Sequence, residues 1–230
     1  MGKVTLTGKG RRWYLRGHPW IYKDDVASAD ATPGELVPVE DPNGAPLGWG
    51  LFSSESRIRV RMVTREAEQP NRAFWSGRLE RAVGHRERLG LMDPAGACRL
   101  VAGDSDGFPG WVVDRYAKTL VIQSGTQGSD RMRDFLIGLL REAMPFEPET
   151  IIDRSDTSVR KLEGLEKIVE VVDGTIDGPV LVQDHGLHYE VDVFQGHKTG
   201  HYLDQSSNRL RAAKLASGGR VLDAFAYDGL

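Results

Sequence analysis

Cationic and aromatic residues suited to RNA gather in the first quarter of the sequence. Residues 9–23 hold Lys and Arg side chains together with Trp20. Cations neutralise phosphates and exposed rings stack on bases, and structured RNA requires both. Arg57, Arg59 and Arg61 follow at i, i+2 and i+4, so one face of a strand would present three guanidinium groups. We therefore predict RNA contacts from nine side chains: Lys9, Arg11, Arg12, Arg16, His18, Lys23, Arg57, Arg59 and Arg61.

These signals also have structural explanations, which stay open at this point. The arginine row suits the solvent face of an edge strand that charge keeps soluble, and Trp20 and Trp49 suit a core. Residues 1–65 carry ten Lys and Arg against seven Asp and Glu, whereas the whole chain has a net charge of −3. A basic front on an acidic body lets one face meet phosphates, but a chance imbalance of surface charge gives the same count.

Four histidines raise a rival function of a different class, that of a metal-dependent hydrolase. They stand at His185, His188, His197 and His201, and the last two have a spacing that binds zinc when it lies on a helix. A glycine directly precedes each of those two and breaks any helix there, and the sequence has no His-Glu-x-x-His motif. We therefore expect surface histidines with satisfied hydrogen bonds, and no metal site.

Cys98 is the only cysteine, so no disulfide forms within the chain, and a reducing cytoplasm is its natural setting. A lone cysteine is usually a small buried hydrophobe, so we predict no catalytic residue in this chain.

Hydrophobic residues make up 40% and charged residues 27%, which is ordinary for a globular protein. The start of the chain does not have the pattern of a signal peptide, and no apolar run approaches the roughly 20 residues that span a bilayer. We expect no membrane contact.

Periodicity predicts a small β-rich unit followed by an α+β unit. Residues 3–65 alternate with period two between turns, and residues 66–70 look like a linker. A helix is expected at 72–89, ended by Gly90, and another at 130–144, begun by Ser129 or Asp130. Strands are expected at 111–113, 120–122, 150–154, 168–173, 180–183 and 187–194, with a hairpin turn at 184–186.

The last fifty residues change character and resemble the opening of an α/β nucleotide-type domain. An irregular loop at 194–204 precedes a helix at 204–216 and a buried strand at 220–225. The turn after this strand must let the backbone approach a ligand, which favours a glycine such as Gly229. His197-Lys198-Thr199 suggests a phosphate-binding loop, but the glycines do not stand at the positions that such a loop requires.

Several blocks of the chain resemble one known family. The most specific is Gly103-Asp104-Ser105-Asp106-Gly107-Phe108-Pro109-Gly110-Trp111, because acidic-x-Asp-Gly-x-Pro-Gly before a Val-rich strand is hard to obtain by chance. Through these blocks the chain is similar to bacterial class I methyltransferases that modify cytosine C5 in large-subunit ribosomal RNA. The other matching blocks are residues 9–12, 16–22, 47–52, 56–61, 99–101, 112–116, 195–205 and 208–209.

The resemblance implies a multidomain chain of α+β and α/β type. Residues 1–68 would form a PUA-like β-barrel that binds RNA, and residues 71–180 a central α+β domain. Residues 181–230 would begin a Rossmann-like domain that uses S-adenosylmethionine (SAM), with loop 195–204 at the rim of the substrate or cofactor site. The cofactor-binding residues implied are Lys198, Thr199, Gly200, Asp204, Asp223, Phe225, Tyr227 and Gly229.

The family chemistry sets a limit on what this chain can do alone. Methylation at C5 of cytosine needs a thiolate that adds to C6, and Cys98 lies far in sequence from the cofactor motif. The chain also departs from the family pattern, with Ser206 in place of Arg and Leu230 in place of the second glycine. We expect ribosomal RNA as the partner and an inactive isolated chain, with a stand-alone RNA-binding module as the alternative. A homodimer that swaps the last strand is one arrangement to test.

Overall fold

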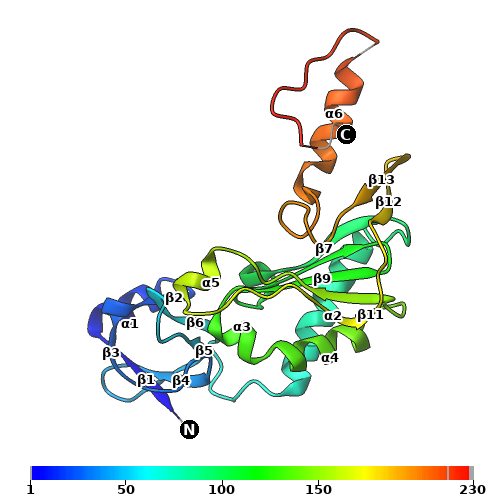
Figure 1. Ribbon diagram of the computed structural model, residues 1–230. Helices are drawn as coiled ribbons and strands as arrows, with labels where there is room; N and C mark the ends of the chain where they lie inside the picture. The colour runs from blue at the N-terminus through cyan, green and yellow to red at the C-terminus, as the bar shows by residue number, and fades with distance from the viewer. Residues whose placement is uncertain (1, 217, 228–230) are drawn as a thin grey trace.

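The computed structural model describes residues 2–216 and 218–227, and its first 65 residues form a six-stranded sheet (Figure 1). The strand order is β2-β6-β5-β4-β1-β3. Val4, Leu6, Ile21 and Val60 are fully buried in the core that the sheet encloses. The β-rich unit expected here is confirmed. Its elements are β1 (Lys3–Leu6), α1 (Gly8–Leu15), β2 (Trp20–Tyr22), the 3-10 helix η1 (Lys23–Asp25), β3 (Val26–Asp30), β4 (Leu36–Glu40), β5 (Pro46–Phe52) and β6 (Ile58–Thr64).

Helix α1 was not expected from the sequence, and local contacts explain it. Thr7 caps its start, with the side-chain oxygen accepting from the Gly10 backbone N–H at 3.0 Å. A Cβ on Gly10 would lie 2.4 Å from the Asp25 carbonyl oxygen. Glycine therefore lets α1 lie directly against η1, and this close approach brings the helix beside β2.

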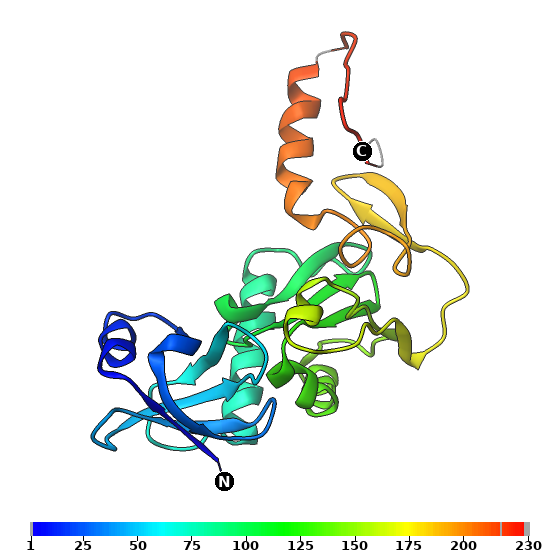
Figure 2. The same ribbon diagram turned by 60° about the vertical axis from the view of Figure 1, so that its left-hand side comes forward.

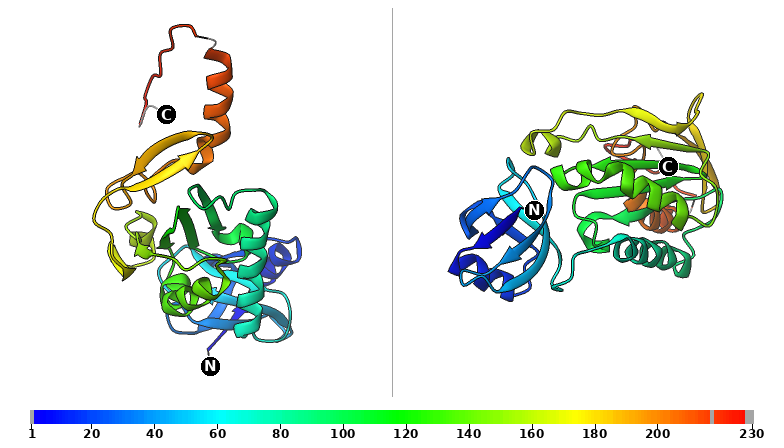
Figure 3. Two further views of the ribbon diagram at one scale, coloured as in Figure 1. Left: turned by 90° about the vertical axis from the view of Figure 1, so that its right-hand side faces the viewer. Right: turned by 90° about the horizontal axis from the view of Figure 1, so that it is seen from below.

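A second, five-stranded sheet has the order β11-β10-β9-β8-β7. Helices α2 and α4 pack together on one face of it (Figure 3). Alternate residues of its strands face opposite ways: Leu120 and Ile122 contact the helices, whereas Val121 faces the other side. The elements are α2 (Arg72–Arg88), β7 (Ala97–Ala102), η2 (Gly103–Asp106), β8 (Trp111–Tyr116), β9 (Thr119–Ser124), α3 (Gln127–Arg131), α4 (Arg133–Ala143), β10 (Thr150–Asp153), α5 (Val159–Leu162) and β11 (Glu170–Gly174).

The expected helix at 72–89 is confirmed, with Gly90 in the left-handed conformation at its end. The helix expected at 130–144 is divided at Met132 into α3 and α4. Its start was also misplaced, because Thr126 and Ser129 form a reciprocal capping box three residues earlier than predicted. Strand β7 was not predicted, since its sequence lacks a clear period-two pattern.

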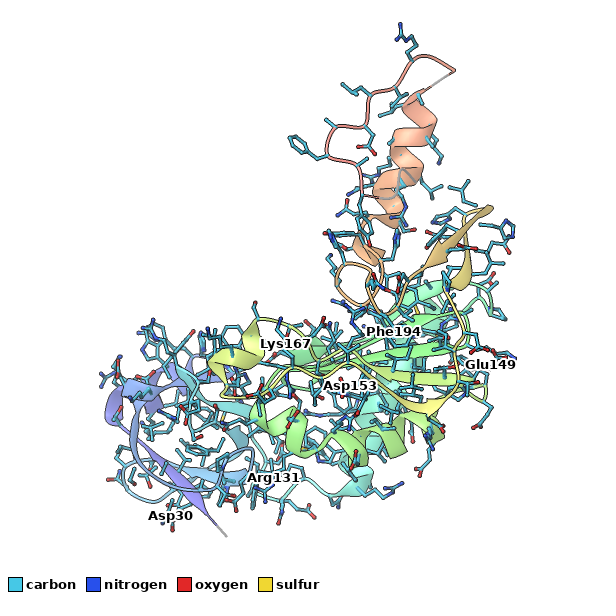
Figure 4. The ribbon with its side chains drawn as sticks, in the orientation of Figure 1. Asp30, Arg131, Glu149, Asp153, Lys167 and Phe194 are labelled. Carbon is cyan, nitrogen blue, oxygen red and sulfur yellow. The ribbon has the colours of Figure 1, made fainter. Side chains whose placement is uncertain are left out.

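The two sheet regions meet through buried and polar contacts. Arg61 of β6 pairs with Glu163 at 2.9 Å, and both side chains are almost completely buried. The Ser54 backbone N–H donates to the Gln127 side-chain oxygen at 2.9 Å. Arg131 reaches across from α3 and donates to the Thr32 hydroxyl at 2.9 Å (Figure 4). These contacts hold the first sheet in one orientation against the second.

A hairpin and a helix complete the described chain, on the far side of the second sheet (Figure 2). Strands β12 (Val180–Asp184) and β13 (Leu187–Val191) are joined at the expected turn, where His185 and Gly186 have positive φ. Phe194 lies where the chain turns from this hairpin (Figure 4). The 3-10 helix η3 (Leu203–Gln205) then leads into α6 (Ser206–Ala216), which projects away from the sheets.

The prediction of a buried strand at 220–225 is wrong. These residues form no strand, and Val221, Leu222 and Phe225 are exposed by 71%, 89% and 104%. An α/β strand is buried only when neighbouring strands and helices cover it, and no described strand lies beside this segment. Across residues 2–216 and 218–227, no helix has both the length and the apolar character that crossing a membrane requires.

Candidate functional site

Four of the nine predicted RNA-binding residues lie together in a cavity of about 450 Å³ on the first sheet region. We call this cavity the aromatic pocket. Lys9, His18, Lys23 and Arg57 are the predicted members. The full lining is Lys9, Trp13, His18, Trp20, Tyr22, Lys23, Asp24, Asp25 and Arg57.

The periodicity of α1 and β2 places the pocket side chains. Lys9 and Trp13 are four residues apart on α1, so they share one face of the helix. Trp20 and Tyr22 are two apart on β2 and share one face of the strand, while Ile21 points into the core and is fully buried. The two elements thus present rings and a cation to the same space.

His18 sits at the centre of the aromatic side chains. Its ring centroid lies 6.3 Å from that of Trp13, 6.2 Å from that of Trp20 and 6.0 Å from that of Tyr22. Its Nδ1 atom lies 3.1 Å from the Trp20 carbonyl oxygen and 3.3 Å from the Trp20 backbone nitrogen. These contacts orient the imidazole, so the pocket walls have a defined geometry before any ligand enters.

The pocket lining carries three cations, Lys9, Lys23 and Arg57, against two carboxylates, Asp24 and Asp25. The Lys23 backbone N–H donates to the Arg57 carbonyl oxygen at 2.9 Å, which makes these two residues neighbours. Both side chains are exposed, and neither forms an ion pair with any residue that the structure describes. Lys9 Nζ lies 3.3 Å from Asp25 Oδ1, and the Asp25 carboxylate is buried.

The other predicted residues on α1 have different surroundings. Arg16 lies over the Trp13 ring at 5.3 Å, on the margin of the aromatic pocket. Arg12 is exposed. Arg11 pairs with Asp41 at 3.1 Å. Backbone N–H donors, that of Ala45 first, lower the pKa of Asp41. Arg11 therefore already has a strong anionic partner.

The expected row of three exposed arginines needs correction. Arg57 precedes β6, Arg59 donates to the carbonyl oxygens of Ser53 (2.8 Å) and Ser54, and Arg61 is buried against Glu163. Arg61 is buried because its partner Glu163 lies in the second sheet region, whereas Arg59 is held by the loop that follows β5. Of the three, only Arg57 presents a free guanidinium group to a phosphate.

Sequence reasoning missed several lining residues, namely Trp13, Tyr22, Asp24 and Asp25. The four-residue spacing from Lys9 and the two-residue spacing from Trp20 were the available signals, once α1 is recognised as a helix. Trp49 is buried, as its core explanation expected, and donates to the Ala67 carbonyl oxygen at 3.0 Å. Trp20 instead lines the pocket and donates to Asp104 at 3.0 Å.

Two of the residues predicted to bind the cofactor line a second cavity, of about 730 Å³, between the second sheet and the C-terminal hairpin. We call it the rim cavity. Lys198 Nζ and Asp204 Oδ1 are 2.7 Å apart at its edge. This hydrogen bond from Lys198 lowers the pKa of Asp204. The other titratable side chains of the lining are His85, Arg86, Asp93, Cys98, Arg99, Asp184, His185 and His201.

Thr199 is a structural residue rather than a rim residue. Its hydroxyl donates to Asp114 Oδ2 at 2.6 Å and accepts from the Tyr116 hydroxyl at 2.8 Å, and it is fully buried. Arg99 donates twice to the same Asp114 carboxylate, at 2.8 and 2.9 Å. Burial, reinforced by Asp114, raises the pKa of Tyr116, so this hydroxyl stays a neutral donor.

The remaining predicted cofactor residues do not converge on the rim cavity. Gly200 has a φ of 142° and its Cβ position lies 2.6 Å from a Val191 methyl, so it serves packing. Asp223 and Phe225 are exposed. Tyr227 stacks on His197 at 4.4 Å between ring centroids, and Gly229 lies outside the described residues. The described residues do not form a closed pocket that would fit SAM.

The four histidines do not form a metal site in the described chain. His185 Nε2 lies 3.0 Å from the Ser206 hydroxyl, whereas His197 stacks on Tyr227. Residues 2–216 and 218–227 contain no group of three or more side chains arranged to hold a metal ion.

Cys98 is 4% exposed, and burial raises the pKa of its thiol. The expectation that it is a small buried side chain is confirmed.

Comparisons with known proteins place the two sheet regions in context. Residues 4–65 match the family model of a PUA-like domain. The whole chain is 38% identical to the ribosomal RNA large subunit methyltransferase I of Shigella boydii serotype 18, of which it spans 59%. The protein of the same name from Escherichia coli O139:H28 is 39% identical with the same coverage, and that from Enterobacter sp. (strain 638) is 37% identical.

Solved structures agree on the fold. A structure described as a SAM-dependent methyltransferase from Streptococcus mutans superposes with a TM-score of 0.76. It shares 18% sequence identity, over 95% of this chain and 55% of that one. A methyltransferase solved in complex with SAH gives the same TM-score over 91% of this chain and 52% of its own. The whole chain is thus similar to 59% of a large-subunit ribosomal RNA methyltransferase, and its residues 4–65 match a PUA-like domain.

Proposed function

We propose that this chain recognises large-subunit ribosomal RNA for SAM-dependent methylation, at cytosine C5 as in the family it resembles. The observation that carries the proposal is the aromatic pocket, where unpaired cations and exposed rings meet in the PUA-like domain. Phosphates and bases are the two parts of RNA that these groups bind. In this proposal residues 1–68 bind RNA, residues 71–180 form the central domain, and residues 181–230 open the cofactor domain.

SAM would supply the methyl group, and Lys198 with Asp204 would stand at the rim of its site. The support is their place on the rim cavity and the similarity of the whole chain to 59% of a ribosomal RNA methyltransferase. Cys98, the one cysteine in the sequence, is buried, and burial raises the pKa of its thiol, which argues against it as the thiolate for C5 methylation. The role proposed for this chain is therefore to recognise and position RNA.

Salt dependence of RNA binding tests this role. Filter binding of the chain to a transcribed fragment of large-subunit ribosomal RNA is measured from low to high salt. Two to three neutralised phosphates give a slope of log affinity against log salt of about −2 to −3. A slope of zero, or equal binding to an uncharged polymer, would overturn the proposal.

A second candidate is an RNA-binding module that does not catalyse methylation by itself. It is favoured by the burial of Cys98 and by the exposure of Asp223 and Phe225 away from the rim cavity. Transfer of labelled methyl groups from SAM to ribosomal RNA separates the two candidates. Turnover by this chain alone supports the enzyme. RNA binding without turnover supports the module.

A further inference from the structure

The aromatic pocket has the dimensions of a site for one small group rather than for a helical surface. Its volume of about 450 Å³ falls in the range of roughly 300–1,000 Å³ that small-molecule sites occupy. Double-stranded RNA meets proteins through a wide, shallow groove and its phosphates, and its bases stay inside the stack. A half-open cavity of this size suits a base that has left the stack better than it suits a continuous duplex.

Two exposed rings form the walls of this pocket. Trp13 is 42% exposed and Tyr22 is 41% exposed, although each packs one side against His18. Arg16 also lies over the Trp13 ring at 5.3 Å, and the remaining exposed part of each ring meets solvent. Stacking of a nucleobase on an aromatic side chain is worth about 1–3 kcal/mol and accepts any base. The walls thus offer stacking without selecting among bases.

The carboxylate of Asp25 can select among nucleobases. It lines the pocket and is 5% exposed, and Oδ1 receives no hydrogen bond from any residue that the structure describes. Lys9 is the nearby cation, at 3.3 Å. A carboxylate only accepts, so its complement on a base is an N–H group. Cytosine, adenine and guanine carry an amino group that meets this need, and the amino group of cytosine is a known partner of Asp and Glu. Uracil has none.

The cations define where the phosphates would lie. Lys23 and Arg57 adjoin at the lining of the pocket and have no acidic partner among the described residues. Arg presents a planar fork to a phosphate, and Lys a point charge. Trp20, the third wall, is held by Asp104 of the second sheet region at 3.0 Å, so its ring is anchored from outside the pocket.

We propose that the aromatic pocket binds one unpaired, amino-bearing nucleotide of the RNA, flipped out of its stack. Its base stacks on Trp13 and Tyr22, its amino group donates to Asp25, and the flanking phosphates contact Lys23 and Arg57. This inference rests on the proposed RNA-binding function and deepens it. The PUA-like domain thereby reads a bulge or loop rather than a continuous duplex.

A set of hairpin RNAs that differ at one nucleotide tests the proposal with the unaltered chain. The probes carry a single bulged cytidine, a bulged uridine, a bulged abasic nucleotide, or no bulge. Binding is followed by quenching of tryptophan fluorescence and by filter binding. We expect the cytidine bulge to bind about 5- to 150-fold more tightly than the abasic bulge, as loss of one stacked base implies. The uridine bulge should fall between them.

Variants then assign the contacts. Trp13→Ala and Tyr22→Ala should abolish the advantage of the cytidine bulge over the abasic bulge, whereas Phe146→Ala, which removes a partly buried ring of the second sheet region, should preserve it. Asp25→Asn should remove the preference for cytidine over uridine, with Asp30→Asn on β3 as the matched control. Circular dichroism verifies the fold of each variant.

The outcomes separate this proposal from the function on which it rests. Equal, salt-dependent binding of all four hairpins by the unaltered chain would overturn the nucleotide pocket and leave RNA binding intact. Binding of none of them, together with a flat salt titration on the ribosomal RNA fragment, would overturn both. A preference for the cytidine bulge that persists in both aromatic variants would also refute the pocket, because the base would then be bound elsewhere.

Discussion

The aromatic pocket and the rim cavity both gather charged side chains, but different ranges of sequence build them. The pocket draws almost all of its lining from residues 9–25, with Arg57 added by strand pairing. The rim cavity draws on α2, β7, the β12–β13 turn and the loop before α6, which only tertiary contacts bring together. A site built from neighbouring turns and strands can be seen in a sequence, whereas one built across domains depends on how the domains pack.

The largest expected effect is a loss of stability, and it tests whether Arg61 is an interior cation or part of the RNA-binding surface. Arg61→Ala leaves the Glu163 carboxylate, whose side chain is 1% exposed, without its partner. Breaking a buried ion pair in this way costs about 3–5 kcal/mol, so urea denaturation should show a matching fall in the free energy of unfolding. The double variant Arg61→Met with Glu163→Leu should recover much of it. A stable Arg61→Ala protein that had lost RNA binding would instead return Arg61 to the RNA surface.

The next effect concerns the loop of the rim cavity. Thr199→Val removes the hydroxyl that links Asp114 to Tyr116, and leaves both buried groups short of a hydrogen bond. We expect a loss of about 1–3 kcal/mol in the free energy of unfolding, measured by thermal and urea denaturation. Thr199→Ser keeps the hydroxyl and should stay near the parent value. Equal stability of the Val and parent proteins would show that the network does not hold the loop.

A third prediction sharpens the assignment of charge to the aromatic pocket. The double variant Lys23→Ala with Arg57→Ala should bind ribosomal RNA about tenfold more weakly and reduce the salt slope by about 1 to 2. Lys118→Ala with Arg141→Ala is the charge-matched control, because these exposed cations pair with Glu149 and Asp173 on the second sheet region. An equal loss in the control pair would mean that the chain binds RNA through net charge alone.

The smallest expected effect is a titration at the rim cavity. The hydrogen bond from Lys198 lowers the pKa of Asp204 below its ordinary value of 3.8. The folded state therefore favours the carboxylate, and the stabilisation is present above pH 3.8 and lost as the pH falls through the folded pKa. Carboxyl NMR should detect the lowered pKa, and Lys198→Met should return it toward 3.8. An unchanged titration in that variant would remove Lys198 as the cause.

The pattern of residues predicted most of the secondary structure, but tertiary contacts decided several boundaries. The helix at 72–89 followed from an apolar stripe and Gly90, which are local signals. The helix expected at 130–144 is divided, and it begins early because the side chains of Thr126 and Ser129 each accept a hydrogen bond from the other's backbone N–H. A hydrophobic stripe does not encode this capping. Helix α1 was missed because Gly8 and Gly10 disfavour a helix, until Gly10 is seen to allow contact with Asp25.

The candidate sites divide in the same way. Lys9, His18, Lys23 and Arg57 were predicted because their chemistry shows in the sequence, and they lie in one pocket. Arg61 and Thr199 have equally suitable side chains, yet both are buried in contacts with residues far away in sequence. Nothing near them in the chain signals Glu163 or Asp114 as partners.

The sequence by itself determined the kinds of chemistry available: many cations and rings in the first 65 residues, one cysteine and no metal-binding motif. It also determined the strands and helices whose apolar periods are strong. Only the tertiary structure decided which cations meet solvent, which pair inside, and whether residues 220–225 lie in a sheet. The physical reason is that burial and ion pairing depend on long-range packing, which places a side chain in water or in the core regardless of its local pattern.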